Sequence, residues 1–107
     1  MNRRDWWSTF RWDEKLSFDD ALDLIRSILE NGRIIYSPHL RERMAERSFT
    51  IQDVEHILEN GVVIAQEFDK RNRNWKYRIS GKTIDDDQAI VVSAVLDRKS
   101  LIVITVF

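Results

Sequence analysis

The chain has 107 residues, enough for one hydrophobic core and little more. It contains no cysteine, which excludes disulfides and thiolate chemistry, and its two histidines are too few for a histidine-rich metal site. The net charge of -1 and the lack of a long apolar run exclude a strongly basic nucleic-acid binder and a membrane span. No stretch near the start resembles a secretory signal, so we expect a cytoplasmic protein. We also expect no cofactor and no metal ion.

Residues 1–16 are predicted to form an aromatic-rich N-terminal extension, and residues 17–107 a single α+β domain. The extension contains four large aromatic residues: Trp6, Trp7, Phe10 and Trp12. The first three fall at helical spacing, although an irregular apolar strap fits equally well. These side chains either pack on the domain's own core or form a partner-binding surface, because tryptophan is enriched at interface hot spots.

Three helices are predicted in the first part of the domain, where apolar residues recur at three- and four-residue spacing. Each begins at a residue that can cap it, namely Ser17, Ser37 and Thr50. The first and third end in the same pentapeptide, Ile-Leu-Glu-Asn-Gly, whose glycine stops a helix. The expected ranges are 17–32, 37–47 and 50–61, with a short extended run at 34–36.

Four strands are predicted in the second part, at 62–68, 75–79, 89–96 and 101–107. Their connections are short, so the strands should form an antiparallel meander. The fold class is therefore α+β, with three helices packed on a four-stranded antiparallel meander sheet. The last two strands are apolar on both faces, which indicates cover on both sides. The helices would cover one side, and the aromatic extension or a partner chain the other.

Helix 37–47 contains the most informative candidate residues. His39, Arg43 and Arg47 are four positions apart, so they form one stripe along a helix. Guanidinium groups bind phosphate oxygens and a histidine transfers protons near neutral pH, so this stripe suits a phosphodiester. It is also typical of an ordinary exposed helix surface, on which Glu42 and Glu46 would neutralise the arginines.

A second basic group lies in the predicted strand 75–79 and just after it: Lys76, Arg78 and Lys82. Alternation places Lys76 and Arg78 on one face, opposite Tyr77 and Ile79. The group is either an RNA-binding surface or the plain solvent face of a sheet. No glycine-rich phosphate loop, nucleophile elbow or metalloprotease motif is present.

The segment Ser-Pro-His-Leu-Arg-Glu-Arg-Met-Ala-Glu-Arg, residues 37–47, resembles the opening signature of the bacterial family called domain of unknown function 4258. The closing run Ile-Val-Ile-Thr-Val at 102–106 also looks like the last strand of that family. The resemblance covers residues 34–107. The family is similar in architecture to RelE-like and MqsR-like toxins, in which helices pack on an antiparallel sheet.

The resemblance implies a metal-independent toxin-type ribonuclease, or a descendant of one, with RNA and an antitoxin protein as partners. His39, Arg43 and Arg47 map to the signature histidine and arginines, and Thr105 to the threonine of the last strand. The implied reaction is cleavage of single-stranded RNA by its own 2′-hydroxyl, with His39 moving the proton. A non-catalytic binding module or a homodimer, built on the tryptophan-rich extension, stays open as the alternative.

Overall fold

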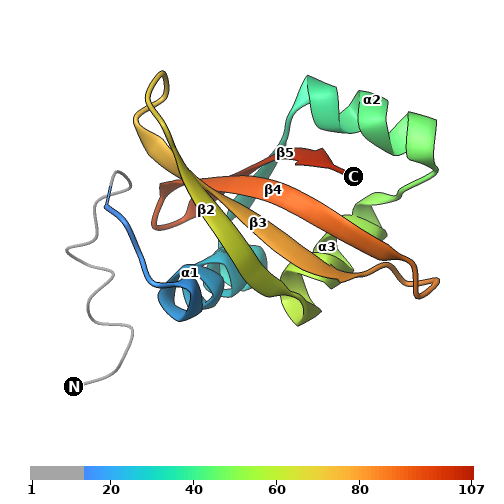
Figure 1. The fold of residues 1–107 in the computed structure, drawn as a ribbon, viewed down its shortest axis with the longest axis horizontal. Helices are drawn as coiled ribbons and strands as arrows, with labels where there is room; N and C mark the ends of the chain where they lie inside the picture. The colour runs from blue at the N-terminus through green and yellow to red at the C-terminus, as the bar shows by residue number, and fades with distance from the viewer. Residues whose placement is uncertain (1–13) are drawn as a thin grey trace.

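The computed structural model describes residues 14–107, which form one mixed sheet with α1 and α3 packed on it (Figure 1). The helices are α1 (Phe18–Asn31), α2 (Pro38–Arg47) and α3 (Ile51–Asn60). The strands are β1 (Arg33–Tyr36), β2 (Val62–Asp69), β3 (Asn74–Lys82), β4 (Gln88–Asp97) and β5 (Ser100–Val106). The α+β class and the three helices are confirmed. Within 14–107, no helix is long and apolar enough to cross a membrane.

The sheet differs from the prediction, because it has five strands in the order β1-β5-β4-β3-β2. Strands β2 to β5 form the expected antiparallel meander, but β1 pairs parallel to β5. The backbone N–H of Arg33 donates to the carbonyl of Lys99 (2.7 Å), and that of Ser37 to Val103 (3.0 Å). The extended run predicted at 34–36 is therefore a strand, but its place in the sheet was missed because its partner lies far along the chain. The four-stranded, wholly antiparallel sheet was therefore wrong in this detail.

Capping side chains begin the helices where the sequence predicts. The hydroxyl oxygens of Ser17 and Ser37 accept backbone N–H groups three residues on, at 3.1 and 3.0 Å. Thr50 and Asp53 form a reciprocal capping box at the start of α3. Asp53 also accepts the backbone N–H of Ile84 (3.0 Å), which ties α3 to the turn between β3 and β4. These hydrogen bonds, those from Thr50 first, lower the pKa of Asp53.

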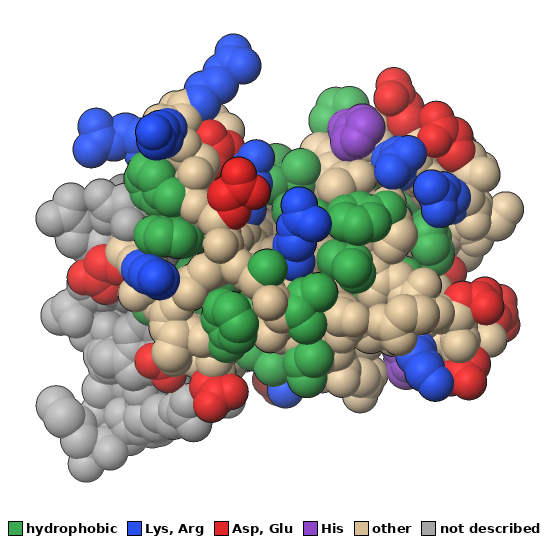
Figure 2. Space-filling view, viewed as in Figure 1, with side chains coloured by type: hydrophobic (Ala, Val, Ile, Leu, Met, Phe, Trp, Pro, Cys, Tyr) green, Lys and Arg blue, Asp and Glu red, His purple; other side chains and the backbone are tan. Residues whose placement is uncertain are grey.

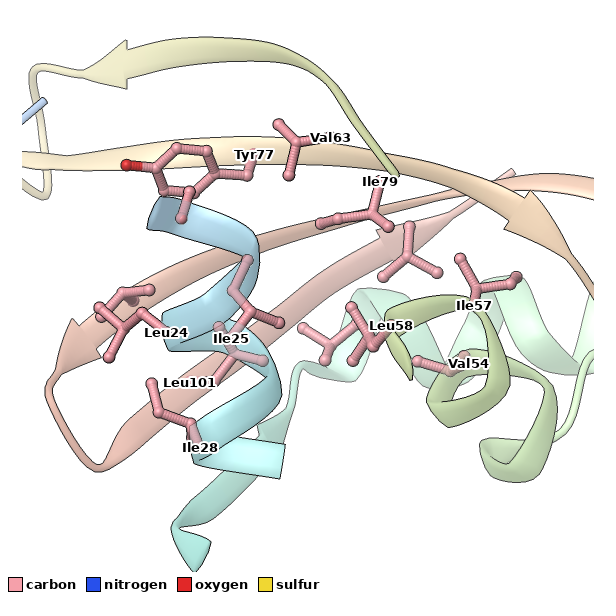
Figure 3. Packing of buried hydrophobic residues seen from close by; sticks show 14 of the residues in the cluster. Leu24, Ile25, Ile28, Val54, Ile57, Leu58, Val63, Tyr77, Ile79 and Leu101 are labelled. Carbon is pink, nitrogen blue, oxygen red and sulfur yellow. The ribbon is translucent and has the colours of Figure 1, made fainter. Parts of the chain in front are cut away.

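The core lies between the sheet and two of the helices, α1 and α3 (Figure 3). Buried side chains of both helices point toward one face of the strands: Leu24, Ile25, Ile28, Val54, Ile57 and Leu58. Tyr77 and Ile79 come from that face of β3 and are buried, as alternation predicts. The opposite face, which α1 and α3 do not cover, is called the open face below. Helix α2 packs beside it against β5 (Figure 1).

Candidate functional site

Two rows of side chains cross the open face from β2 to β5. Strand pairing sets the members of each row. The first row is Glu67, Lys76, Ala94 and Ile102, and the second is Ala65, Arg78, Val92 and Thr105. Figure 2 shows this side of the molecule, where apolar side chains gather around charged ones over the middle strands. Each row therefore places one cation of β3 beside an apolar side chain of β4, followed on β5 by Ile102 in the first row and Thr105 in the second.

Two hollows lie along this face. The first has a volume of about 390 Å³, and its lining includes Arg78, Thr105 and Phe107. The second has a volume of about 400 Å³, and its lining includes Ser37 and Asn72. Both hollows are also lined by Lys76 and Ile104, so they adjoin at these residues. The second hollow extends from the β2–β3 hairpin to the start of α2, and the first lies beside it; the two hollows together are called the depression below.

Asp69 connects that hairpin to the site. Its Oδ1 accepts the backbone N–H groups of Arg71 (3.0 Å) and Asn72 (3.2 Å), and its Oδ2 accepts the Asn72 side-chain amide (2.9 Å). The same Oδ2 lies 3.4 Å from Nζ of Lys76. Hydrogen bonds from Asn72, followed by the charge of Lys76, lower the pKa of Asp69 from 3.8 to about 2. The carboxylate is therefore ionised at neutral pH and holds both the turn and the lysine.

Arg78 lies over an aromatic ring in the first hollow. Its guanidinium carbon is 5.7 Å from the ring centroid of Phe107, a cation–π arrangement. One residue of the lining, Thr105, has a buried side-chain oxygen, Oγ1, without a hydrogen-bond partner among residues 14–107. A buried polar atom normally has a partner, so this hydroxyl is a candidate contact for a polar ligand group.

The predicted stripe lies on helix α2, which begins directly after Ser37 at one end of this depression. His39 and Arg47 are exposed, and Arg43 is half-buried and lies 3.7 Å from Glu46. None of these side chains belongs to the lining of the two hollows. The helix start is fixed to β5, because the hydroxyl of Ser37 donates to the carbonyl of Ile104 (2.6 Å). Ser37 lines the second hollow, and His39 comes two residues later in the chain.

The other predicted residues are distributed differently. Lys76 and Arg78 come together on the open face, whereas Lys82 is the last residue of β3, lines neither hollow and lies 3.5 Å from Asp86. The predicted partner-binding residues of the extension lie outside the described residues: Trp6, Trp7, Phe10 and Trp12. Within 14–107, no group of three His, Asp or Glu residues is placed to hold a metal ion.

Sequence reasoning missed the roles of Asp69, Asn72 and Phe107, because each depends on hairpin register or on the position of the last strand. The connection between the first and second predicted strands, from Asp69 to Arg73, shows in the sequence only as a polar turn. An Asp at the start of a polar turn commonly accepts the backbone N–H two residues on. The position of Asp69 at the start of this turn is therefore the signal that predicts an ordered turn. Nothing local in the sequence predicts that Phe107 meets Arg78.

The described fold contains the whole depression within residues 36–107. The sequence pattern of the family "Domain of unknown function (DUF4258)" matches these same residues, more than half of the chain. The chain belongs to the DUF4258 family. The family region includes α2, α3 and β2 to β5, hence every residue that lines the two hollows, and α1 precedes it. No curated protein and no solved structure matches the chain.

Proposed function

We propose that this DUF4258 protein is a RelE-like, toxin-type ribonuclease that needs no metal ion and cleaves single-stranded RNA. The observation that carries the proposal is the open face, where Lys76 and Arg78 stand beside apolar side chains in adjoining hollows. Single strands are bound by cations that hold the phosphates and by apolar or aromatic surfaces on which bases stack. Both features are found together here.

Each group in the depression has a role in this proposal. Lys76 and Arg78 bind consecutive phosphates, and Arg78 with Phe107 forms a platform on which a base stacks. The unpartnered hydroxyl of Thr105 donates to a phosphate or base oxygen. A duplex would hide its bases from this surface, so the substrate is unpaired RNA.

His39 is the proposed proton-transfer group, because it is exposed and follows by two residues Ser37, which lines the second hollow. The ribose 2′-oxygen attacks the adjacent phosphorus while the imidazole takes its proton. The bond from phosphorus to the 5′-oxygen breaks, and the imidazolium returns the proton to that oxygen. The products are a 2′,3′-cyclic phosphate and a 5′-hydroxyl. Arg43 and Arg47 are the proposed groups that stabilise the charge developing on the phosphate.

A toxin of this type is held inactive in its own cell by an antitoxin, which we propose as the protein partner. Induced expression of the chain alone should then stop bacterial growth. His39→Ala should restore growth at matched protein levels.

The direct test is cleavage of a fluorescent single-stranded RNA by purified protein in the presence of EDTA. The protein should cleave with EDTA present, and His39→Ala should lower the rate by roughly 10²–10⁴-fold, as for loss of a general base. His56→Ala is the matched control, since His56 lies on α3 and contacts Asn60. Arg78→Gln should weaken RNA binding as well as cleavage.

Three results would contradict the proposal. Absence of both binding and cleavage would exclude an RNA-directed function. RNA binding without cleavage would contradict the ribonuclease activity and would support a role in RNA binding only. Equal loss in His39→Ala and His56→Ala would remove His39 from the reaction.

A further inference from the structure

The charges that line the open face balance one another. Two cations, Lys76 and Arg78, are offset by two carboxylates, Glu67 and Asp69. Glu67 stands directly across from Lys76, and Asp69 is 3.4 Å from it. Most of the affinity for a nucleic-acid backbone comes from cations that neutralise phosphates. The depression therefore needs a further source of positive charge to hold RNA.

The tip of the β2–β3 hairpin carries additional positively charged side chains. Lys70, Arg71 and Arg73 are all exposed there. Within the part of the chain that the structure describes, none of these three side chains forms an ion pair. Figure 2 shows Lys and Arg side chains gathered at this projecting tip, above the depression.

The tip is a built turn rather than a free loop. The carboxylate of Asp69 receives three hydrogen bonds from within it, and Arg73 has a left-handed backbone with φ of 55°. Asp69 and Asn72 also line the second hollow together with Lys76. The three cations therefore lie on an ordered turn, and two residues of that turn, Asp69 and Asn72, also line the depression.

A second hairpin turn of the same chain offers a comparison. The turn between β4 and β5 reads Asp97-Arg98-Lys99, and the β2–β3 turn reads Asp69-Lys70-Arg71. In both turns the Asp accepts the backbone N–H two residues on, at 2.8 Å from Lys99 and 3.0 Å from Arg71. The β4–β5 turn, however, borders a small hollow of about 160 Å³ at the end of α1, away from the open face. The two turns share an Asp followed by two cations and the hydrogen bond that this Asp accepts, and they differ in length and in what they adjoin.

We infer that the tip of the β2–β3 hairpin is a second RNA-binding site, at which Lys70, Arg71 and Arg73 hold the phosphate backbone where the strand enters the open face. This inference rests on the proposed function. The contact is independent of sequence, because it reads phosphates only. Its role is to supply the affinity that the charge-balanced depression lacks.

The test measures binding of a short fluorescein-labelled 2′-O-methyl oligouridylate, which cannot be cleaved through the 2′-oxygen, over a range of salt concentrations. The variant K70Q/R71Q is compared with R98Q/K99Q, which makes the same charge change on the other turn. For K70Q/R71Q we expect the slope of log K against log salt to fall by about 1.4, which is 0.7 for each lost phosphate contact. At low salt, its Kd should rise on the order of tenfold. For R98Q/K99Q we expect the native slope, and both variants should melt at the native temperature.

The outcomes separate this inference from the function on which it rests. If the native protein binds RNA and the two variants lose affinity equally, or neither loses any, only the role of the tip is overturned. A native protein that binds no RNA would overturn both. A selective loss in K70Q/R71Q, with R78Q also weakened, would support a strand that runs from the tip onto the open face.

Discussion

Among single residues, Asp69 links local structure to the site. One carboxylate orders the β2–β3 turn through three hydrogen bonds and contacts Lys76 on the open face. Its ionised form receives all of these contacts, which explains a pKa of about 2 in the folded chain. The turn and the lysine therefore depend on the same charge.

This lowered pKa makes the turn sensitive to acid. Because the folded pKa lies below the unfolded one, Asp69 stabilises the fold fully above pH 3.8, and this contribution is lost as the pH falls toward about 2. We expect the melting temperature of the native protein to drop over that interval and that of Asp69→Asn to drop less. Thermal melts from neutral pH to about pH 2 measure the difference. Asp85→Asn, on an exposed turn, is the control, and parallel curves for Asp69→Asn and native protein would contradict the assignment.

Among the elements, the end of α3 shows why a glycine is required there. Gly61 has an extended backbone, with φ of -81°, so conformational freedom is not the reason. A Cβ at this position would lie 2.6 Å from the carbonyl oxygens of both Ile57 and Ser80. Helix α3 ends so close to β3 that only a hydrogen atom fits between them. Gly32 meets the carbonyl of Lys99 in the same way at the end of α1.

Gly61→Ala should consequently be costly, whereas Gly81→Ala should be milder. At Gly81 the nearest atom to a new Cβ is the Cα of Gly61, at 3.2 Å, which a small shift relieves. We expect the free energy of unfolding of Gly61→Ala to fall by roughly 1–3 kcal/mol, as for overpacking, and that of Gly81→Ala to fall by less. Urea denaturation of the two variants measures the order. The reverse order would show that α3 and β3 can separate at little cost.

For the whole molecule, the folded unit begins a little before α1. Leu16 is buried in the core cluster, and Nζ of Lys15 lies 5.6 Å from the ring centroid of Trp75. Burial raises the pKa of Tyr77 to about 12, and a backbone hydrogen bond with Leu16 opposes this change more weakly. The last residues of the predicted extension 1–16 thus contact the domain.

Two truncated chains would locate this boundary. A chain that begins at Glu14 keeps Leu16, and a chain that begins at Ser17 loses it. We expect the longer chain to be more stable to urea by about 1.5–3 kcal/mol, the value of one buried leucine. Equal stability would place Leu16 outside the folding unit. Growth arrest by the longer chain would also show that residues 1–13 are not needed for toxicity.

Local chemistry made much of the fold predictable. Caps at Ser17, Ser37 and Thr50 act within a few residues and are therefore visible in the sequence. The glycines after α1 and α3 marked the helix ends correctly, although contacts with distant carbonyl groups are what require them. Alternation in β3 correctly put Tyr77 inward. The signature of residues 37–47 correctly indicated the family, which the match over 36–107 confirms. The roles of His39, Arg43 and Arg47 stay predictions.

The sequence by itself therefore determined the helices, the meander, the family and which face of β3 carries the cations, because each depends on near neighbours. Only the tertiary structure decided what depends on distant segments. It added β1 beside β5, brought Asp69 to Lys76 and Phe107 to Arg78, and separated Lys82 from both cations. Strand register and sheet order decide these meetings, and residues far apart in the chain establish both.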